Sequence, residues 1–256
     1  MSHNEIAIRS CKGEKEFDAC VDLQREVWKF TDVELVPMHL FVVAEEIGGQ
    51  VIGAFDGEDL IGFVLAFPGM HSHEQRPRPY LYSHLLAVRE SYRNANLGYR
   101  LKLAQRDDAI DRGFDLIEWT FDPLEIKNAH LNICKLGAIV RRYSVNHYGT
   151  SSSPLHRGLP TDRIIAEWWV KSNRVANLLG SGRQPDFKVV KKIQVPAQIY
   201  SWKKSETDLA QAVEVQTRNR EEFLKAFSQG LAVLGYDRDQ DSNGSYLLGQ
   251  WPGEQL

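Results

Sequence analysis

The stretch RNANLG, residues 93–98, lies between an apolar run, YLYSHLLAV (80–88), and an amphipathic run, LGYRLKLAQRDDAIDRG (97–113). The first run predicts a β-strand, and the second predicts a helix that ends at Gly113. Asn96 suits the bend between them, because asparagine tolerates a positive φ better than most residues with a side chain. Backbone amides at a helix start attract anions, and the helix dipole assists them. The stretch therefore predicts a phosphate-binding cradle, with a plain solvated turn as the alternative.

The regions around this stretch alternate between helical and strand-like patterns. Helical spacing covers 14–30, 37–48, 97–112, 123–137 and 205–230. Strand-like runs cover 50–55, 60–67, 80–88, 115–121, 138–145, 162–170, 188–195, 232–239 and 244–251. Gly57 suits the turn of a hairpin between the first two strands, and the prolines of 68–79 indicate a loop. We expect residues 171–187 to form a connection.

Composition restricts the class of protein. The chain has 256 residues, of which 43% are hydrophobic, so it can build a sizeable core. Its formal net charge of -3 provides no basic field for nucleic acid or an anionic membrane. Three cysteines without metal-type spacing indicate a reducing compartment. Since the N-terminal residues lack an apolar signal core, we expect a cytoplasmic protein.

The order of these elements, with the cradle after a strand, resembles the GNAT acyltransferase superfamily over about residues 5–171. The cradle pattern of that family is Gln or Arg, two residues, Gly, one residue, then Gly or Ala. Arg93 and Gly98 match it, and Asn96 replaces the first glycine. The stretches WTFDPLEIKNAHLN (119–132) and TDRIIAEWW (161–169) also resemble a little-characterised subfamily, often described as predicted GNAT acetyltransferases.

This resemblance implies an α/β (α+β) fold in which helices flank a mixed central sheet. It implies a GNAT acyltransferase domain over residues 1–171. Residues 172–256 then form a C-terminal strand, helix and hairpin extension, which we expect to pack on the sheet or to extend it.

The resemblance also implies acetyl-CoA or another acyl-CoA as the donor. The pyrophosphate is expected on the cradle and the following helical turn, and the pantetheine arm along the strand end. Asn128 is a further candidate for the pantetheine or the acceptor, with Asn132 four residues later on the same predicted helical face. The expected donor-binding residues are Leu86, Ala87, Val88, Arg93, Asn94, Ala95, Asn96, Leu97, Gly98, Tyr99 and Asn128.

Amine acylation requires a group that removes a proton from the nucleophile. His84 is the first candidate, because its ordinary pKa lies near neutrality and it lies on the strand that leads to the cradle. The alternative is a histidine hydrogen-bonded within the sheet. Glu118 is the second candidate, with a structural ion pair as the alternative. The resemblance implies that the acyl carbonyl lies near His84, Glu118, Tyr82 and Thr120.

The general acid is harder to assign. The family often has a tyrosine four residues before the glycine of its Leu-Gly pair, but Ile133 occupies that position. Cys134, Tyr143 and Tyr148 remain candidates, although packing explains each of them as well. The stretch HSHE (71–74) is too short and isolated to predict a metal site, and none is predicted.

The sequence thus predicts an N-acyltransferase that moves an acetyl or another small acyl group to a primary amine of a small molecule, with an amino acid favoured. A succinyl group is an option, because Arg141 and Arg142 suit a donor carboxylate; solvated strand-end charges are the alternative. A non-catalytic acyl-CoA-binding module of the same fold is the rival function. The expected partners are coenzyme A and the amine, without nucleic acid or membrane, and a homodimer stays open.

Overall fold

The computed structural model describes residues 5–29, 31–71, 77–93, 95–149, 159–251 and 253. The chain divides into two compact units. The described residues up to Glu118 belong to the first unit, and those from Trp119 onwards belong to the second.

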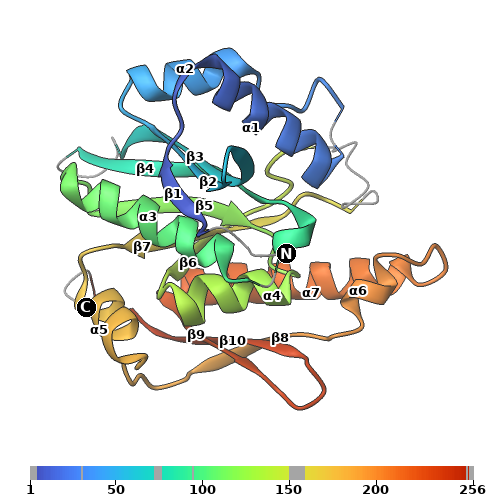
Figure 1. Ribbon diagram of the computed structural model, residues 1–256. Coiled ribbons are helices and arrows are strands. Elements are labelled where there is room, and N and C mark those ends of the chain that lie inside the picture. The colour runs from blue at the N-terminus through green and yellow to red at the C-terminus, as the bar shows by residue number, and fades with distance from the viewer. Residues whose placement is uncertain are drawn as a thin grey trace. The chain divides into compact units, whose positions relative to one another are not determined.

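The first unit is a mixed sheet with helices on both faces (Figure 1). Its strands lie in the order β1-β2-β3-β4-β5, with antiparallel pairing from β1 to β4. β4 and β5 are parallel neighbours through Leu81↔Ile117 and Tyr82↔Glu118. The elements are β1 (Ala7–Ser10), α1 (Gly13–Trp28), α2 (Met38–Glu46), β2 (Gln50–Asp56), β3 (Asp59–His71), β4 (Arg78–Val88), η1 (Glu90–Tyr92), α3 (Leu97–Asp111) and β5 (Leu116–Phe121), whose residues from Trp119 onwards belong to the second unit.

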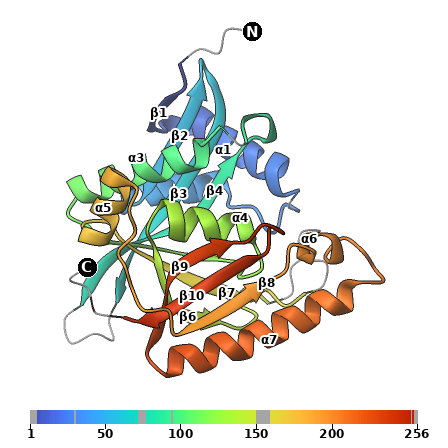
Figure 2. The same cartoon turned by 90° about the horizontal axis from the view of Figure 1, so that it is seen from below.

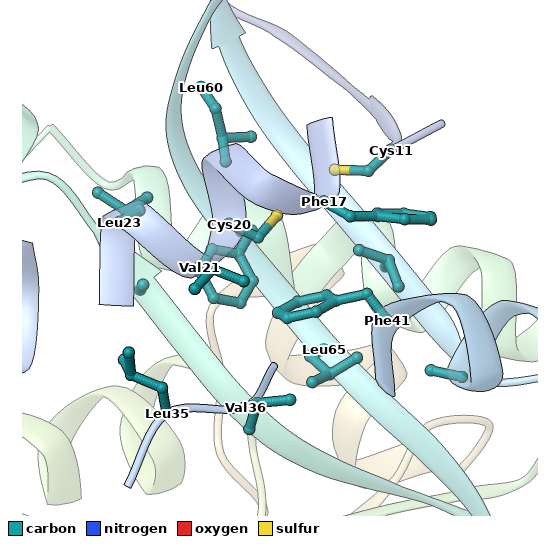
Figure 3. Close-up of a cluster of buried hydrophobic side chains, with 14 of the residues drawn as sticks. Cys11, Phe17, Cys20, Val21, Leu23, Leu35, Val36, Phe41, Leu60 and Leu65 are labelled. Atoms are coloured by element: carbon teal, nitrogen blue, oxygen red, sulfur yellow. The ribbon is translucent and has the colours of Figure 1, made fainter. Parts of the chain in front are cut away.

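Helices α1 and α2 cover one face of this sheet through a buried aromatic cluster (Figure 3). Phe17 of α1 stacks on Phe41 of α2, with 6.1 Å between the ring centroids. Phe41 also meets Phe63 of β3 edge to face at 5.7 Å. Each of these rings is at least 98% buried, and full burial of an aromatic side chain contributes about 1.5–3 kcal/mol. The amphipathic spacing of 14–30 therefore produces the expected helix.

Helix α3 packs on the opposite face, and its start has the geometry expected from the sequence. Leu97 and Leu101 lie in a second apolar cluster with Ile61 and Val64 of β3. Asn96, directly before the helix, has φ 56° in the left-handed region, where most side chains are disfavoured. The bend at RNANLG is therefore confirmed.

The loop expected over 68–79 is too long, because β3 continues to His71 and β4 begins at Arg78. Pro68 pairs with Leu81 of β4. On the other side of β3, the register with β2 ends opposite Ala66. Pro68 therefore lies beyond β2, where a strand tolerates the loss of one N–H donor.

The second unit contains a sheet in the order β7-β6-β9-β10-β8. β9 pairs with β6 through Val140↔Val233, and β10 pairs with both β9 and β8. Figure 2 shows α7 beside β8. The elements are α4 (Ile126–Ala129), the π-helical η2 (His130–Lys135), β6 (Ile139–Ser144), β7 (Arg163–Trp169), α5 (Asn173–Ser181), β8 (Lys191–Val195), α6 (Ile199–Trp202), α7 (Leu209–Ser228), β9 (Leu231–Arg238) and β10 (Gly244–Gln250).

The connection expected over 171–187 is wrong for its first half, which forms α5. The Ser172 side chain caps this helix by accepting a hydrogen bond from the Val175 amide at 3.3 Å. Val175 and Leu178 are buried. Arg174 is also buried and donates to the carbonyls of Gly137 and Leu234 at 2.9 and 2.6 Å. Tertiary contacts thus stabilise a helix whose polar and glycine residues resemble a loop.

Ser172→Ala is expected to lower the free energy of unfolding by about 1 kcal/mol, because the Val175 amide loses its acceptor. Urea unfolding measures the change. Ser172→Asp, which retains an acceptor at the same place, is expected to stay close to the original stability. Equal stability of the alanine variant would contradict the capping role.

Candidate active site

A β-bulge in β4 sets the position of His84. Leu85 pairs with Leu65 of β3, whereas Ser83 pairs with the next residue, Ala66. His84 is therefore the extra residue on β4. Such bulges bend a strand, redirect a side chain and occur often beside active sites.

His84 is half-buried among aromatic rings. Its ring centroid lies 5.9 Å from that of Phe67 and 6.2 Å from that of Tyr82. Among the described residues, it makes ring contacts and has no hydrogen-bond partner. Burial lowers the pKa of His84 below its ordinary value of 6.5. The imidazole is therefore neutral at neutral pH and can accept a proton.

Glu118 lies in β5 and is 4% exposed. One of its carboxylate oxygens, Oε2, is 3.3 Å from Nε2 of His71, at the end of β3. The His71 ring in turn stacks on Tyr80, with 4.2 Å between the centroids. His71 is thus the partner that a structural ion pair of Glu118 would need. The pair is ionic only when the His71 imidazole is protonated.

His71 was not selected from the sequence, where it belongs to HSHE. Residues 72–76 of that stretch lie outside the described residues. The signal that would have found His71 is the length of β3, since a strand that continues past Pro68 brings its end opposite the start of β4. The pairing with Glu118 is a tertiary contact and leaves no pattern in the sequence.

The cradle connects β4 to α3. The Asn96 carbonyl accepts from the Arg100 amide at 3.0 Å, which begins the helix. The amides of the first helical turn, including those of Leu97, Gly98 and Tyr99, have no acceptor within an α-helix. Arg93 donates from Nε to the Val88 carbonyl at 3.3 Å. Asn94 lies outside the described residues, and Ala95 is exposed.

A side chain at Gly98 would face Leu86 and Val88 of β4. A Cβ atom at this position would approach Leu86 and Val88 only to 3.8 and 3.9 Å, which are ordinary contact distances. Leu86 and Val88 pack toward α3, whereas Ala87 belongs to the cluster under α1 and α2. The three residues expected along the pantetheine arm therefore differ in the face they present.

A buried lysine, also missed in the sequence, fixes β4 from the α3 side. Lys102 is 2% exposed, and its Nζ donates to Ser83 Oγ at 3.0 Å and to Gln105 Oε1 at 2.8 Å. Burial lowers the pKa of Lys102 well below its ordinary range. Ser83 faces α3 and Leu85 packs on the α1–α2 cluster, so the bulge at His84 reverses the alternation of the strand.

In the second unit, the two asparagines expected on one helical face differ in their exposure to solvent. Asn128 of α4 is exposed, whereas Asn132 is 3% exposed. The helix becomes π-helical at His130, where hydrogen bonds run from i to i+5. The expectation of one shared face is therefore wrong, because a spacing of four no longer keeps two residues aligned.

The candidate acids are held in different ways. Tyr143 donates to Asp162 at 2.6 Å, and burial together with this bond raises its pKa. Cys134 donates to the Tyr236 carbonyl at 3.1 Å, and burial raises its pKa. Tyr148 is about half exposed and its hydroxyl is 2.9 Å from Thr120 Oγ1 in β5. Of the three, Tyr148 is held beside β5.

Arg141 and Arg142 are partly solvated, with side chains 37% and 45% exposed, but both also have an acidic partner. Both approach the buried carboxylate of Glu167, at 2.6 Å for Arg141 and 3.4 Å for Arg142. Glu167 is 1% exposed, and a buried carboxylate needs such partners. The two guanidinium groups thus already have a carboxylate to neutralise within the second unit.

Within the described residues, no three His, Cys, Asp or Glu side chains form a group that could hold a metal ion. None of the helices described combines the length and the apolar character that crossing a bilayer requires.

Residues 15–131 match the model of the acetyltransferase (GNAT) family. This segment of the chain is thus similar to GNAT acetyltransferase domains. The matched residues include the bulged β4, the cradle, α3 and β5. Acetyl-CoA is the donor that the GNAT family uses.

Solved structures share this GNAT fold. The ribosomal-protein-S18-alanine N-acetyltransferase from Escherichia coli matches with a TM-score of 0.52 at 14% identity, covering 65% of this chain and 94% of its own. The structure of yncA, a putative acetyltransferase from Salmonella typhimurium solved with its cofactor acetyl-CoA, matches with a TM-score of 0.52 at 14% identity. The match covers 66% of this chain and 95% of yncA. An N-acetyltransferase from Staphylococcus aureus Mu50 matches with a TM-score of 0.51 at 13% identity, covering 66% of this chain and 100% of its own. No curated protein matches the chain.

Proposed function

We propose that this acetyltransferase transfers an acetyl or other small acyl group from coenzyme A to a primary amine of a small molecule, with an amino acid as the favoured acceptor. The observation that carries the proposal is His84, a neutral imidazole held at a bulge on the strand that leads to the cradle. The net charge of -3 offers no strong attraction to a polyanion or a polycation.

The cradle suits the donor. The amides of Arg93 to Tyr99 would bind the pyrophosphate, assisted by the positive end of the α3 dipole. Gly98 lies in the first turn of α3 and has no side chain that could keep a phosphate away from the backbone. Leu86, Ala87 and Val88 would line the pantetheine arm, and Asn128 would add a polar contact. Bound acetyl-CoA supplies an activated acyl group and a thiolate leaving group.

His84 would take a proton from the acceptor ammonium before the attack, or from the amine as its nitrogen bonds to the acyl carbon and the thiolate leaves, directly or through one water. Its lowered pKa keeps it unprotonated at neutral pH. Glu118 would act as the second proton acceptor, and its contact with His71 offers the proton a path to a more exposed group. Tyr148 is the remaining candidate for protonating the thiolate.

A non-catalytic acyl-CoA-binding module is the second candidate function. Ile133 favours it, because it stands where the family often places a tyrosine, and it is fully buried. Under both functions we assign residues 1–171 to the acyltransferase domain and 172–256 to an extension. The thiols of Cys11, Cys20 and Cys134 are free, which supports the proposed cytoplasmic location.

An assay of coenzyme A thiol release tests the proposal. Purified protein with acetyl-CoA is expected to release thiol in the presence of free amino acids or other small primary amines, and mass spectrometry is expected to find the N-acetyl product. Succinyl-CoA is included as a second donor. Tight binding of acetyl-CoA without turnover on any amine would favour the binding module, and turnover restricted to peptides would overturn the small-molecule acceptor.

His84→Ala is expected to lower kcat by about 10² to 10⁴ at neutral pH, while the Kd for acetyl-CoA stays nearly unchanged. In the original protein, the rate is expected to fall with decreasing pH below 6.5, as protonation removes the base. This acidic limb is expected to vanish in the variant. Unchanged turnover with the limb intact would transfer the role to Glu118 or to water.

Gly98→Val is expected to fold, because a Cβ atom at this position meets Leu86 and Val88 only at 3.8 and 3.9 Å. The variant is expected to bind acetyl-CoA at least tenfold more weakly, since a branched side chain would crowd the start of α3, where the backbone must approach the pyrophosphate. Calorimetry measures the affinity and circular dichroism checks the fold. Full affinity in a folded variant would contradict the assignment of the cradle.

A further inference from the structure

Side chains of α6 and β10 hold the turn that connects β5 to α4. This turn, Asp122–Glu125, lies between two elements of the proposed site. Lys203, directly after α6, approaches Asp122 Oδ2 at 2.8 Å and Glu125 Oε1 at 3.1 Å with its Nζ. Lys203 is 8% exposed. Two carboxylates of the turn are thus tied to one buried cation.

Two tyrosines add contacts to the turn and to the helix that follows it. The Tyr200 hydroxyl of α6 accepts a hydrogen bond from the Lys127 amide at 3.3 Å, at the start of α4. The Tyr246 hydroxyl of β10 donates to the Pro123 carbonyl at 2.8 Å, and Tyr246 is fully buried. The Ala197 amide, two residues before α6, donates to Asn243 beside β10 at 2.8 Å. The elements that hold the turn are thus joined to each other.

The charges in this group stabilise one another. Burial alone would raise the pKa of Asp122, but the attraction of Lys203 and its hydrogen bond outweigh burial and lower it. Burial alone would lower the pKa of Lys203, but Asp122 and Glu125 outweigh burial and raise it. Lys203 therefore stays a cation across the neutral range, and Asp122 stays an anion.

We propose that Lys203 is a positioning residue that sets the β5–α4 turn, and with it Asn128, for binding of the acyl-CoA donor. The inference rests on the proposed donor contact of Asn128. The turn leads from Thr120 in β5 to Asn128 in α4, so a shift of the turn moves polar groups at both of its ends. Lys203 lies outside residues 15–131, which match the family model. The C-terminal extension thereby supplies a side chain that holds a turn within the matched segment.

Lys203→Met tests the proposal, with Arg220→Met as the matched control. Arg220 also pairs with a buried carboxylate of the second unit, Asp162, at 2.8 Å, but among the described residues it makes no hydrogen bond or ion pair with the turn. Both variants are expected to lose thermal stability. Only Lys203→Met is expected to raise the KM and Kd for acetyl-CoA, by about tenfold, while kcat changes less than threefold. Lys203→Arg is expected to restore most of the affinity.

An unchanged Kd for acetyl-CoA in folded Lys203→Met would overturn the proposal, as would an equal rise in Arg220→Met. Should Lys203→Met fail to fold, Tyr200→Phe provides a milder test, because it removes only the hydroxyl that accepts from the start of α4. This variant is expected to raise the Kd for acetyl-CoA about threefold. An unchanged Kd would again overturn the proposal. Calorimetry with coenzyme A separates this result from catalysis. If the protein binds the donor but shows no turnover, the proposed reaction is wrong, and the effect of Lys203 on the Kd can still be measured.

Discussion

The register between β3 and β4 is the constraint on which the first unit depends. A shift of one residue in a strand exchanges its two faces, and the bulge at His84 makes such an exchange in the middle of β4. Ser83 reaches the buried Lys102 of α3, whereas Leu85 packs under α1 and α2. The faces that β4 presents on either side of the bulge, and the position of His84, therefore depend on one extra residue.

Much of the fold was predictable because its signals are local. Apolar spacing gave α1, and the tolerance of Asn96 for a positive φ gave the bend before α3. The fold around α5 was missed, since that helix depends on the tertiary contacts of Arg174 with Gly137 and Leu234. The end of β3 was missed because Pro68 resembles a loop residue unless the shorter length of β2 is known.

The site was less predictable than the fold. His84 was found from its place on a strand before the cradle, which is a local feature. Its neutral state and the partnership of Glu118 with His71 depend on burial and on contacts between distant residues. The π-helical turn that separates Asn132 from Asn128 likewise leaves no signal in the spacing of the sequence. Whether these residues act in catalysis stays a prediction.

The left-handed conformation of Asn96 would change the entropy of the proposed phosphate binding. Glycine samples more backbone conformations than any other residue, and an asparagine at the same position restricts the chain before any ligand arrives. A loop that is already ordered loses less conformational entropy when it closes around a phosphate. With Asn96 at φ 56°, part of the ordering that a glycine-rich loop undergoes on binding has already taken place during folding.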